Sequence, residues 1–209
     1  MMTDKWINIL MRQFRAAVLG FFLLAGHEAR AFYVNFYAGQ AYPGGAVVAA
    51  DGVTGLPTSG GGIGYAFGVS MGAKMSKGLA LEYGLFYGPR GFSFVQNSQN
   101  YSYSTTAVQF PLMLRIPMLR FVFFGVGPYF AYSLGSLELS PAYGSGAQIS
   151  AVDYGLVGSL GIMIPLAVGM SVVGDARYVN GIKNVSLNSS FIAGFTEVQG
   201  FVGLRFGRW

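Results

Sequence analysis

The stretch GIGYAFGVSMGAK, residues 62–74, alternates between two kinds of side chain along its whole length. Successive side chains of a β-strand point to opposite faces of the sheet, so a period of two predicts a strand with one apolar face and one small or polar face. The apolar face reads Ile63, Tyr65, Phe67, Val69, Met71 and Ala73, and the other face reads Gly64, Ala66, Gly68, Ser70, Gly72 and Lys74.

Seven further segments show the same alternation, which brings the predicted number of strands to eight. They cover residues 32–38, 81–87, 108–116, 122–132, 152–164, 170–178 and 198–206. The connections alternate in length, with tight turns near 75–77, 117–119 and 165–168, and long loops over about 40–61, 88–102, 135–150 and 183–193. Short periplasmic turns and longer external loops are typical of outer-membrane barrels. The sequence therefore predicts an all-β protein, an eight-stranded antiparallel transmembrane up-and-down β-barrel.

The placement of charges indicates which face meets lipid. A Lys or Arg on the lipid face at the bilayer midplane costs about 2 to 4 kcal/mol, so a barrel is expected to keep its charges inside or at its ends. A soluble β-sandwich or lipocalin-like barrel is the alternative, but only 10% of this chain is charged. The charges predicted to face the lumen are Lys74, Glu82, Arg115, Asp153, Asp175, Arg177, Glu197 and Arg205.

The beginning of the chain has the pattern of an export signal. Arg12 and Arg15 precede the apolar run AAVLGFFLLAG, residues 16–26, which is too short to span a bilayer, and Ala29-Arg30-Ala31 predicts cleavage before Phe32. We therefore expect residues 1–31 to be a cleaved signal peptide and residues 32–209 to form one barrel domain in the bacterial outer membrane. The mature chain would carry nine basic and six acidic residues, a balance that gives no support for nucleic-acid binding.

The residue types needed for most enzyme chemistry are missing from the predicted mature chain. There is no cysteine, and the one histidine, His27, lies in the predicted signal. Histidine-assisted hydrolysis or acyl transfer and His/Cys metal sites are therefore not expected, nor is any cofactor. A lipid-modifying outer-membrane enzyme ranks third among the functions considered.

Several short motifs resemble those of the small outer-membrane barrel family that includes PorT-like proteins, in the same broad class as OmpX and the OmpA transmembrane domain. They are VQFPLML at 108–114, GVGPY at 125–129, and DARY at 175–178 followed by Gly181. The residue before the apolar-Pro step is often acidic in that family and is Gln109 here. A proline removes a ladder hydrogen bond, so Pro111 and Pro128 are expected to mark bulges or bends.

The interior of an eight-stranded barrel is about wide enough for its own side chains, and ionised groups there need partners. We predict an ion-pair network among the lumen charges, with Arg177 and Glu197 as partners. The alternative is a narrow charge-lined channel for small solutes, in the space left by Gly64, Gly68, Gly72, Gly125 and Gly127.

The external loops contain apolar residues where water is expected, in AVVAA at 46–50 and FIAGF at 191–195. These segments either prolong strands above the membrane or form a lip, with Phe191, Ile192 and Phe195, that binds a protein or a hydrophobic ligand. A structural or interaction role is the function expected first. The other expected partners are outer-membrane lipid and the barrel assembly machinery, for which the apolar, aromatic end of the chain (Val202, Leu204, Phe206, then GRW) would be a signal.

Overall fold

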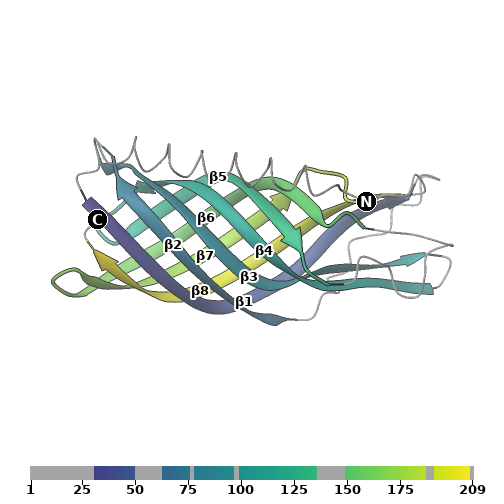
Figure 1. Ribbon diagram of the computed structural model, residues 1–209, viewed down its shortest axis with the longest axis horizontal. Helices are drawn as coiled ribbons and strands as arrows, with labels where there is room; N and C mark the ends of the chain where they lie inside the picture. Colours follow the sequence, from purple (N-terminus) through teal and green to yellow (C-terminus); the bar gives the residue numbers. More distant parts are fainter. Residues whose placement is uncertain are drawn as a thin grey trace, which may run out of the picture.

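The computed structural model describes residues 31–49, 63–75, 78–96, 99–135, 149–186 and 191–207 of the 209-residue chain. Eight strands in these ranges form one closed barrel, in which each strand pairs antiparallel with its neighbours in the sequence and β8 closes against β1 (Figure 1). The predicted fold class and strand count are confirmed. The strands are β1 (Ala31–Ala49), β2 (Gly64–Lys74), β3 (Ala80–Gln96), β4 (Gln99–Pro117), β5 (Val122–Ser133), β6 (Val152–Ala167), β7 (Met170–Gly181) and β8 (Phe191–Gly207).

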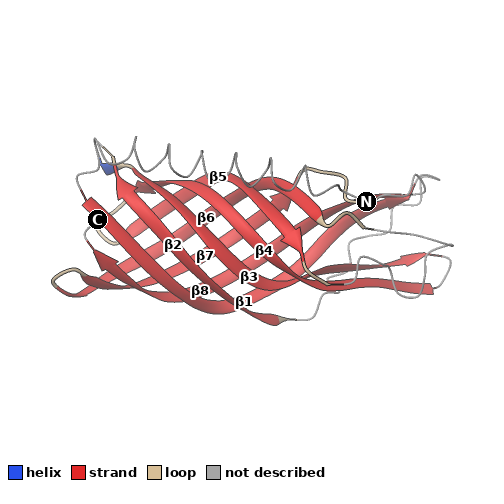
Figure 2. Cartoon of the chain, viewed as in Figure 1, coloured by secondary structure: helices blue, strands red, loops and turns tan. Residues whose placement is uncertain are grey.

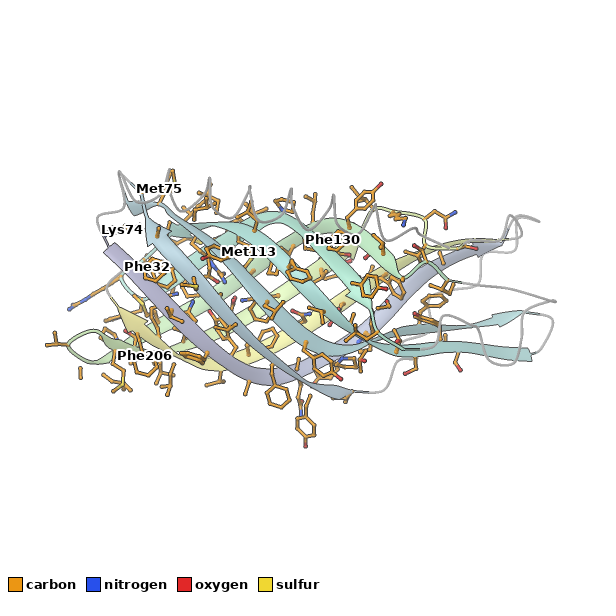
Figure 3. The ribbon with its side chains drawn as sticks, viewed as in Figure 1. Phe32, Lys74, Met75, Met113, Phe130 and Phe206 are labelled. Carbon is orange, nitrogen blue, oxygen red and sulfur yellow. The ribbon has the colours of Figure 1, made fainter. Side chains whose placement is uncertain are left out.

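The two faces of the barrel wall are arranged as the alternation predicts. Phe67, Leu112 and Ile162 are 41% to 54% exposed on the outside, whereas Asp175 and Arg205 are at most 3% exposed on the inside. Figure 3 labels Phe32, Phe130 and Phe206 on the exposed face and Met113 on the buried one. Apolar side chains therefore cover the outer surface and ionised ones line the enclosed axis, the reverse of a soluble protein.

Almost all of the described chain is strand (Figure 2). Among the described residues, no helix is both long and apolar enough to cross a bilayer. Two tight turns fall where they are predicted, because β2 ends at Lys74 and β4 at Pro117, whereas β6 continues to Ala167, past the predicted start of its turn at residue 165. The predicted export signal lies outside the described residues, apart from Ala31.

Strand continues into two of the expected long loops, so their predicted bounds are wrong. β1 continues through Ala49, and β3 and β4 continue to a narrow hairpin in which Gln96 pairs with Gln99. These extensions are rich in Val, Tyr, Thr and Ser, and Val, Tyr and Thr favour strands. Outside the membrane, backbone hydrogen bonds can continue the sheet even where the strand has no apolar face. The outer face of β4 changes from Phe110 and Val108 to Thr106, Ser104 and Ser102, which marks the level where lipid ends.

The prolines of β4 and β5 do not produce the expected bulges. The ladder is interrupted between Pro111 and Leu114, opposite Pro128, but it resumes in the same register. The register shift in this wall lies instead between Pro165 and Ala167, at the β6–β7 turn. A turn absorbs an extra residue with less disruption than the middle of a ladder does.

Candidate functional site in the barrel interior

A buried ion network occupies the lower half of the lumen, toward the short turns. Arg115 on β4 is its centre, because its Nη2 lies 2.7 Å from Oε1 of Glu82 and 2.7 Å from Oδ2 of Asp175. Its Nη1 also donates to the hydroxyl of Ser159. All three charged side chains are fully enclosed. One guanidinium thus joins strands β3, β4 and β7 across the lumen.

Two further arginines complete this lower network. Arg177 contacts Asp175 through Nη2 at 2.8 Å and through Nε at 2.9 Å. Arg205 lies 3.7 Å from Oε2 of Glu82 and donates from Nε to Asn35 at 2.7 Å. Tyr33 adds a hydrogen bond from its hydroxyl to Glu82 at 3.0 Å. Three guanidinium groups therefore share two carboxylates. Tyr33, Asn35 and Ser159 supply the further hydrogen-bond partners of these charged groups.

The predicted pair of Arg177 with Glu197 is wrong. In the β7–β8 register Arg177 lies opposite Gln199, and Glu197 lies opposite Val179, two residues closer to the loops. Arg177 instead bonds the carboxylate two residues before it on its own strand. Glu197 accepts hydrogen bonds from Gln109 at 2.6 Å and from Gln199 at 2.8 Å. The amide at position 109 therefore serves Glu197 as a donor, which a carboxylate there would not do.

A second ion pair lies in the upper half of the lumen, between Arg90 and Asp153. Nη2 of Arg90 lies 2.5 Å from Oδ2 of Asp153, and the hydroxyl of Tyr129 donates to the same oxygen at 2.5 Å. Arg90 falls within the loop predicted over residues 88–102, so it is absent from the predicted lumen charges. The available signal was the β3 alternation itself, since Glu82, Phe86 and Arg90 share one face when the strand is continued past Tyr87.

Two clusters of three aromatic rings fill the levels between and above the charges. Tyr37, Phe86 and Phe201 lie 5.3 to 5.7 Å apart between ring centroids, and the guanidinium carbon of Arg177 lies 3.9 Å from the centroid of Phe86. Cation–π contacts of this kind are strongest where water is excluded. The lumen thus alternates between charged and aromatic levels.

The upper aromatic cluster consists of Phe92, Tyr103 and Phe195, with centroids 5.5 to 5.8 Å apart. The guanidinium of Arg90 lies 4.3 Å from the Phe195 ring. Phe195 is therefore buried inside the barrel, and its predicted place on an exposed loop is wrong. The reason is that β8 begins at Phe191, before the position where a loop was expected to end.

The inward glycines provide space that other side chains occupy. A Cβ on Gly68 would lie 2.1 Å from the Phe86 ring, and one on Gly72 would lie 2.1 Å from the Tyr33 ring. The position of Gly125 is filled in the same way by Arg115, and that of Gly64 by the ring of Pro89. At Gly127 a Cβ would meet the backbone of β4 instead. These glycines therefore admit rings and a guanidinium.

The remaining predicted residues lie apart from these clusters. Lys74 is half-buried at the short-turn end of β2, and it forms no salt bridge with any residue that the structure describes. The backbones of Phe191 and Ile192 pair with Ala49 and Val48 of β1, as expected if the apolar segments prolong strands. Within the described ranges, no group of three or more His, Cys, Asp or Glu side chains is placed to hold a metal ion.

Comparison with known proteins agrees with this architecture. The family model described as "Outer membrane protein beta-barrel domain" matches residues 52–187, which is more than half of the chain. The match confirms the resemblance to small outer-membrane barrels. No curated protein matches the chain.

Solved structures of other outer-membrane proteins resemble this chain at low sequence identity. OprG from Pseudomonas aeruginosa is 15% identical, with a TM-score of 0.53, and the match covers 88% of this chain and 98% of OprG. Ail of Yersinia pestis is 10% identical (TM-score 0.44; 84% and 99% covered). Neisserial surface protein A is 15% identical (TM-score 0.44; 84% and 97% covered). At 15% identity the likeness to OprG concerns the fold alone.

Proposed function

Because the chain belongs to the family of outer membrane protein beta-barrel domains and lies in the bacterial outer membrane, we propose that it is a closed scaffold that binds a partner outside the cell. The binding surface would be the β3–β4 hairpin together with the extended ends of β1 and β8. The barrel would hold this surface above the membrane, and it would neither conduct solutes nor catalyse a reaction.

The filled lumen is the observation that carries this proposal. Charged residues from β3, β4, β7 and β8 meet across the axis, and an aromatic cluster lies directly above them. Each level is built from side chains that are almost completely buried. A conducting pore needs a continuous polar path, and eight strands leave little room beyond their own side chains. This packing favours an interaction role over the narrow channel.

The hairpin has the composition and the support of a binding surface. No charged residue occurs between Arg90 and Arg115, and residues 96–106 read QNSQNYSYSTT. Tyr, Ser and Asn are enriched in antibody binding loops, because tyrosine gives contact area at low entropic cost and the small polar residues adapt their hydrogen bonds. The cluster of Phe92, Tyr103 and Phe195 ties the base of this hairpin to β8. The hairpin would therefore already be ordered before a partner binds, which lowers the entropic cost of binding.

Planar-bilayer recording separates the scaffold from the channel. The purified full-length mature protein is expected to insert without a reproducible unit conductance. A porin measured in the same membrane controls for insertion. A unit conductance that changes in Arg177→Ala or Glu197→Gln would contradict the proposal.

The binding surface itself is tested with a shortened hairpin. Residues 94–101 are replaced by an Asn-Gly turn, which keeps Phe92 and Tyr103 and matches the two-residue hairpins of natural sheets. Wild type and variant, both in lipid nanodiscs, are screened against arrays of extracellular proteins and glycans. Binding by the wild type that is lost in the variant supports the proposal, provided that both show heat-modifiable gel migration. Binding that survives the replacement, or no binding at all, would count against it.

The proposal also includes removal of residues 1–31 during export. Amino-terminal sequencing of the protein from outer membranes is expected to read FYVNF, starting at Phe32. A different first residue would move the boundary of the mature chain.

For the enzyme alternative, turnover of labelled lipid A or phospholipid by the purified protein would overturn the non-catalytic role.

A further inference from the structure

The β4–β5 and β6–β7 turns leave large apolar side chains exposed at the short-turn end of the barrel. Val168 is 90% exposed and Leu119 is 70% exposed. A contiguous cluster of exposed apolar side chains usually marks a site that contacts a protein, a ligand or a membrane, whereas single exposed apolar residues do not. We call this set the apolar turn patch, and it consists of Met118, Leu119, Phe121, Ile164, Leu166 and Val168.

The two turns form one surface because the strands between them are paired. The backbone N–H of Met163 donates to the carbonyl of Phe121 at 2.7 Å, and Val122 lies opposite Ile162 in the β5–β6 ladder. The β6–β7 turn is also held to the end of β8, since the N–H of Gly207 donates to the carbonyl of Gly169 at 2.8 Å. In Figure 1 this turn projects beyond the end of the barrel near the C-terminus.

The apolar turn patch continues the lipid-facing surface without a break. The outer face of β6 reads Tyr154, Leu156, Gly158, Leu160, Ile162, Ile164 and Leu166, with no charged or amide side chain. At about 3.3 Å per residue and a tilt of about 40°, this run extends about 30 Å along the barrel axis before the turn is reached. The usual height of the lipid-facing band is about 25 Å, so the apolar run of β6 exceeds it before the turn is reached.

One cation lies within the apolar turn patch. Arg120 is exposed in the β4–β5 turn, and its guanidinium carbon lies 5.1 Å from the Phe121 ring centroid. An arginine can lay its stem on apolar surface while its head reaches a more polar level. Apolar residues beside a flexible cation match a phospholipid interface, where acyl chains and anionic phosphates lie a few ångströms apart.

We propose that the apolar turn patch inserts into the inner, phospholipid leaflet of the outer membrane. The apolar run of β6 is longer than the usual lipid-facing band, and a membrane protein accommodates excess apolar length by tilting. Such a tilt draws the β4–β5 and β6–β7 turns into the inner leaflet. The guanidinium of Arg120 lies at the level of the phosphates. This proposal does not depend on the partner outside the cell.

The chain has no cysteine, so single cysteines can carry a nitroxide label at chosen depths. Val168→Cys and Leu119→Cys report on the apolar turn patch, Leu112→Cys reports on the lipid-facing band, and Ser104→Cys reports on the water-exposed extension of β4. The labelled full-length mature proteins are placed in vesicles of phosphatidylethanolamine and phosphatidylglycerol. Electron paramagnetic resonance then measures collision of each label with oxygen, which enters the bilayer, and with a water-soluble nickel chelate.

Labels at positions 168 and 119 are expected to resemble the label at position 112, with oxygen accessibility well above nickel accessibility. The label at 104 is expected to show the opposite ratio. Ratios at 168 and 119 that match the label at 104 would overturn the proposal, and they would leave the patch free for a periplasmic protein. If Val168→Cys fails to fold, Met118→Cys in the neighbouring turn gives the same readout.

Discussion

Arg115 is the residue on which the lower ion network depends most. Its guanidinium contacts Glu82 and Asp175 at 2.7 Å each in a fully enclosed site. Arg115→Met would leave two buried carboxylates with fewer partners, and breaking a buried ion pair on one side costs about 3 to 5 kcal/mol. Urea unfolding of the refolded barrel in vesicles is expected to show a loss of that size. Lys74→Met, at a lysine that forms no salt bridge with any described residue, is the control, and equal stabilities of the two variants would refute the central role of Arg115.

The inward glycines give a second prediction at the scale of single residues. An alanine at position 72 would place its Cβ 2.1 Å from the Tyr33 ring, whereas an ideal Cβ on Gly200 meets no atom within 4 Å. Overpacking of this kind costs about 1 to 3 kcal/mol. Gly72→Ala is therefore expected to lower the free energy of unfolding by that amount, and Gly200→Ala, on the lipid-facing side, is expected to leave it unchanged. A similar loss in both variants would mean that glycine matters here for the strand backbone and not for the ring.

The sequence predicted which way the charged residues face but not which residues they contact. The period of two assigns Glu82, Arg115, Asp175 and Arg205 to the interior, and the structure buries all of them. The partner of each charged side chain depends on the register between strands and on the side-chain rotamer. A single sequence gives neither directly. Arg177 shows this best, because a shift of two residues along β8 separates it from Glu197.

The β3–β4 hairpin is the element that most distinguishes this barrel from a minimal one. Phe92→Ala would remove one ring of the three-ring cluster that supports this hairpin, and with it the contacts to both Tyr103 and Phe195. The hairpin is then expected to be cut faster by a protease added to intact vesicles, while the barrel keeps its heat-modifiable migration. Phe110→Ala on the lipid-facing side of β4 is the control. Unchanged cleavage in Phe92→Ala would show that the backbone ladder alone holds the hairpin.

Element boundaries were predictable only at the short-turn end. There the chain has strong breakers close to the ends of the apolar runs, such as Pro117 and Gly169, and the strands stop as expected. At the other end, the change from an apolar to a polar outer face on β4 was taken for the end of the strand. It is instead the end of the lipid contact, since Tyr103 and Thr105 continue the buried face above it. Hydrophobic alternation thus reports where lipid ends more directly than where pairing ends.

The architecture as a whole was predictable because all eight strands show the same alternation of outward apolar and inward small or polar side chains. An inside-out alternation with few charges leaves a lipid-facing barrel as the only arrangement that pairs every backbone group and hides every ionised one. The sequence could not predict whether the lumen is filled by side chains or open to solutes. An inward glycine gives the same sequence pattern in both cases. The neighbours of Gly68 and Gly72 decide it, and they come from distant positions in the chain.

The proposed closure of the lumen rests on several levels stacked in series, so no single level should control it. In the double variant Phe86→Ala/Phe201→Ala the lower aromatic cluster loses two of its three rings. The ion network around Arg115 still lies below the gap, and the cluster of Phe92 with Tyr103 still lies above it. We expect planar-bilayer recordings of the double variant to remain without unit conductance. Conductance that appears on removing these two rings would show that the lower aromatic cluster is the sole barrier, and the charged levels would then have to be hydrated enough to pass ions.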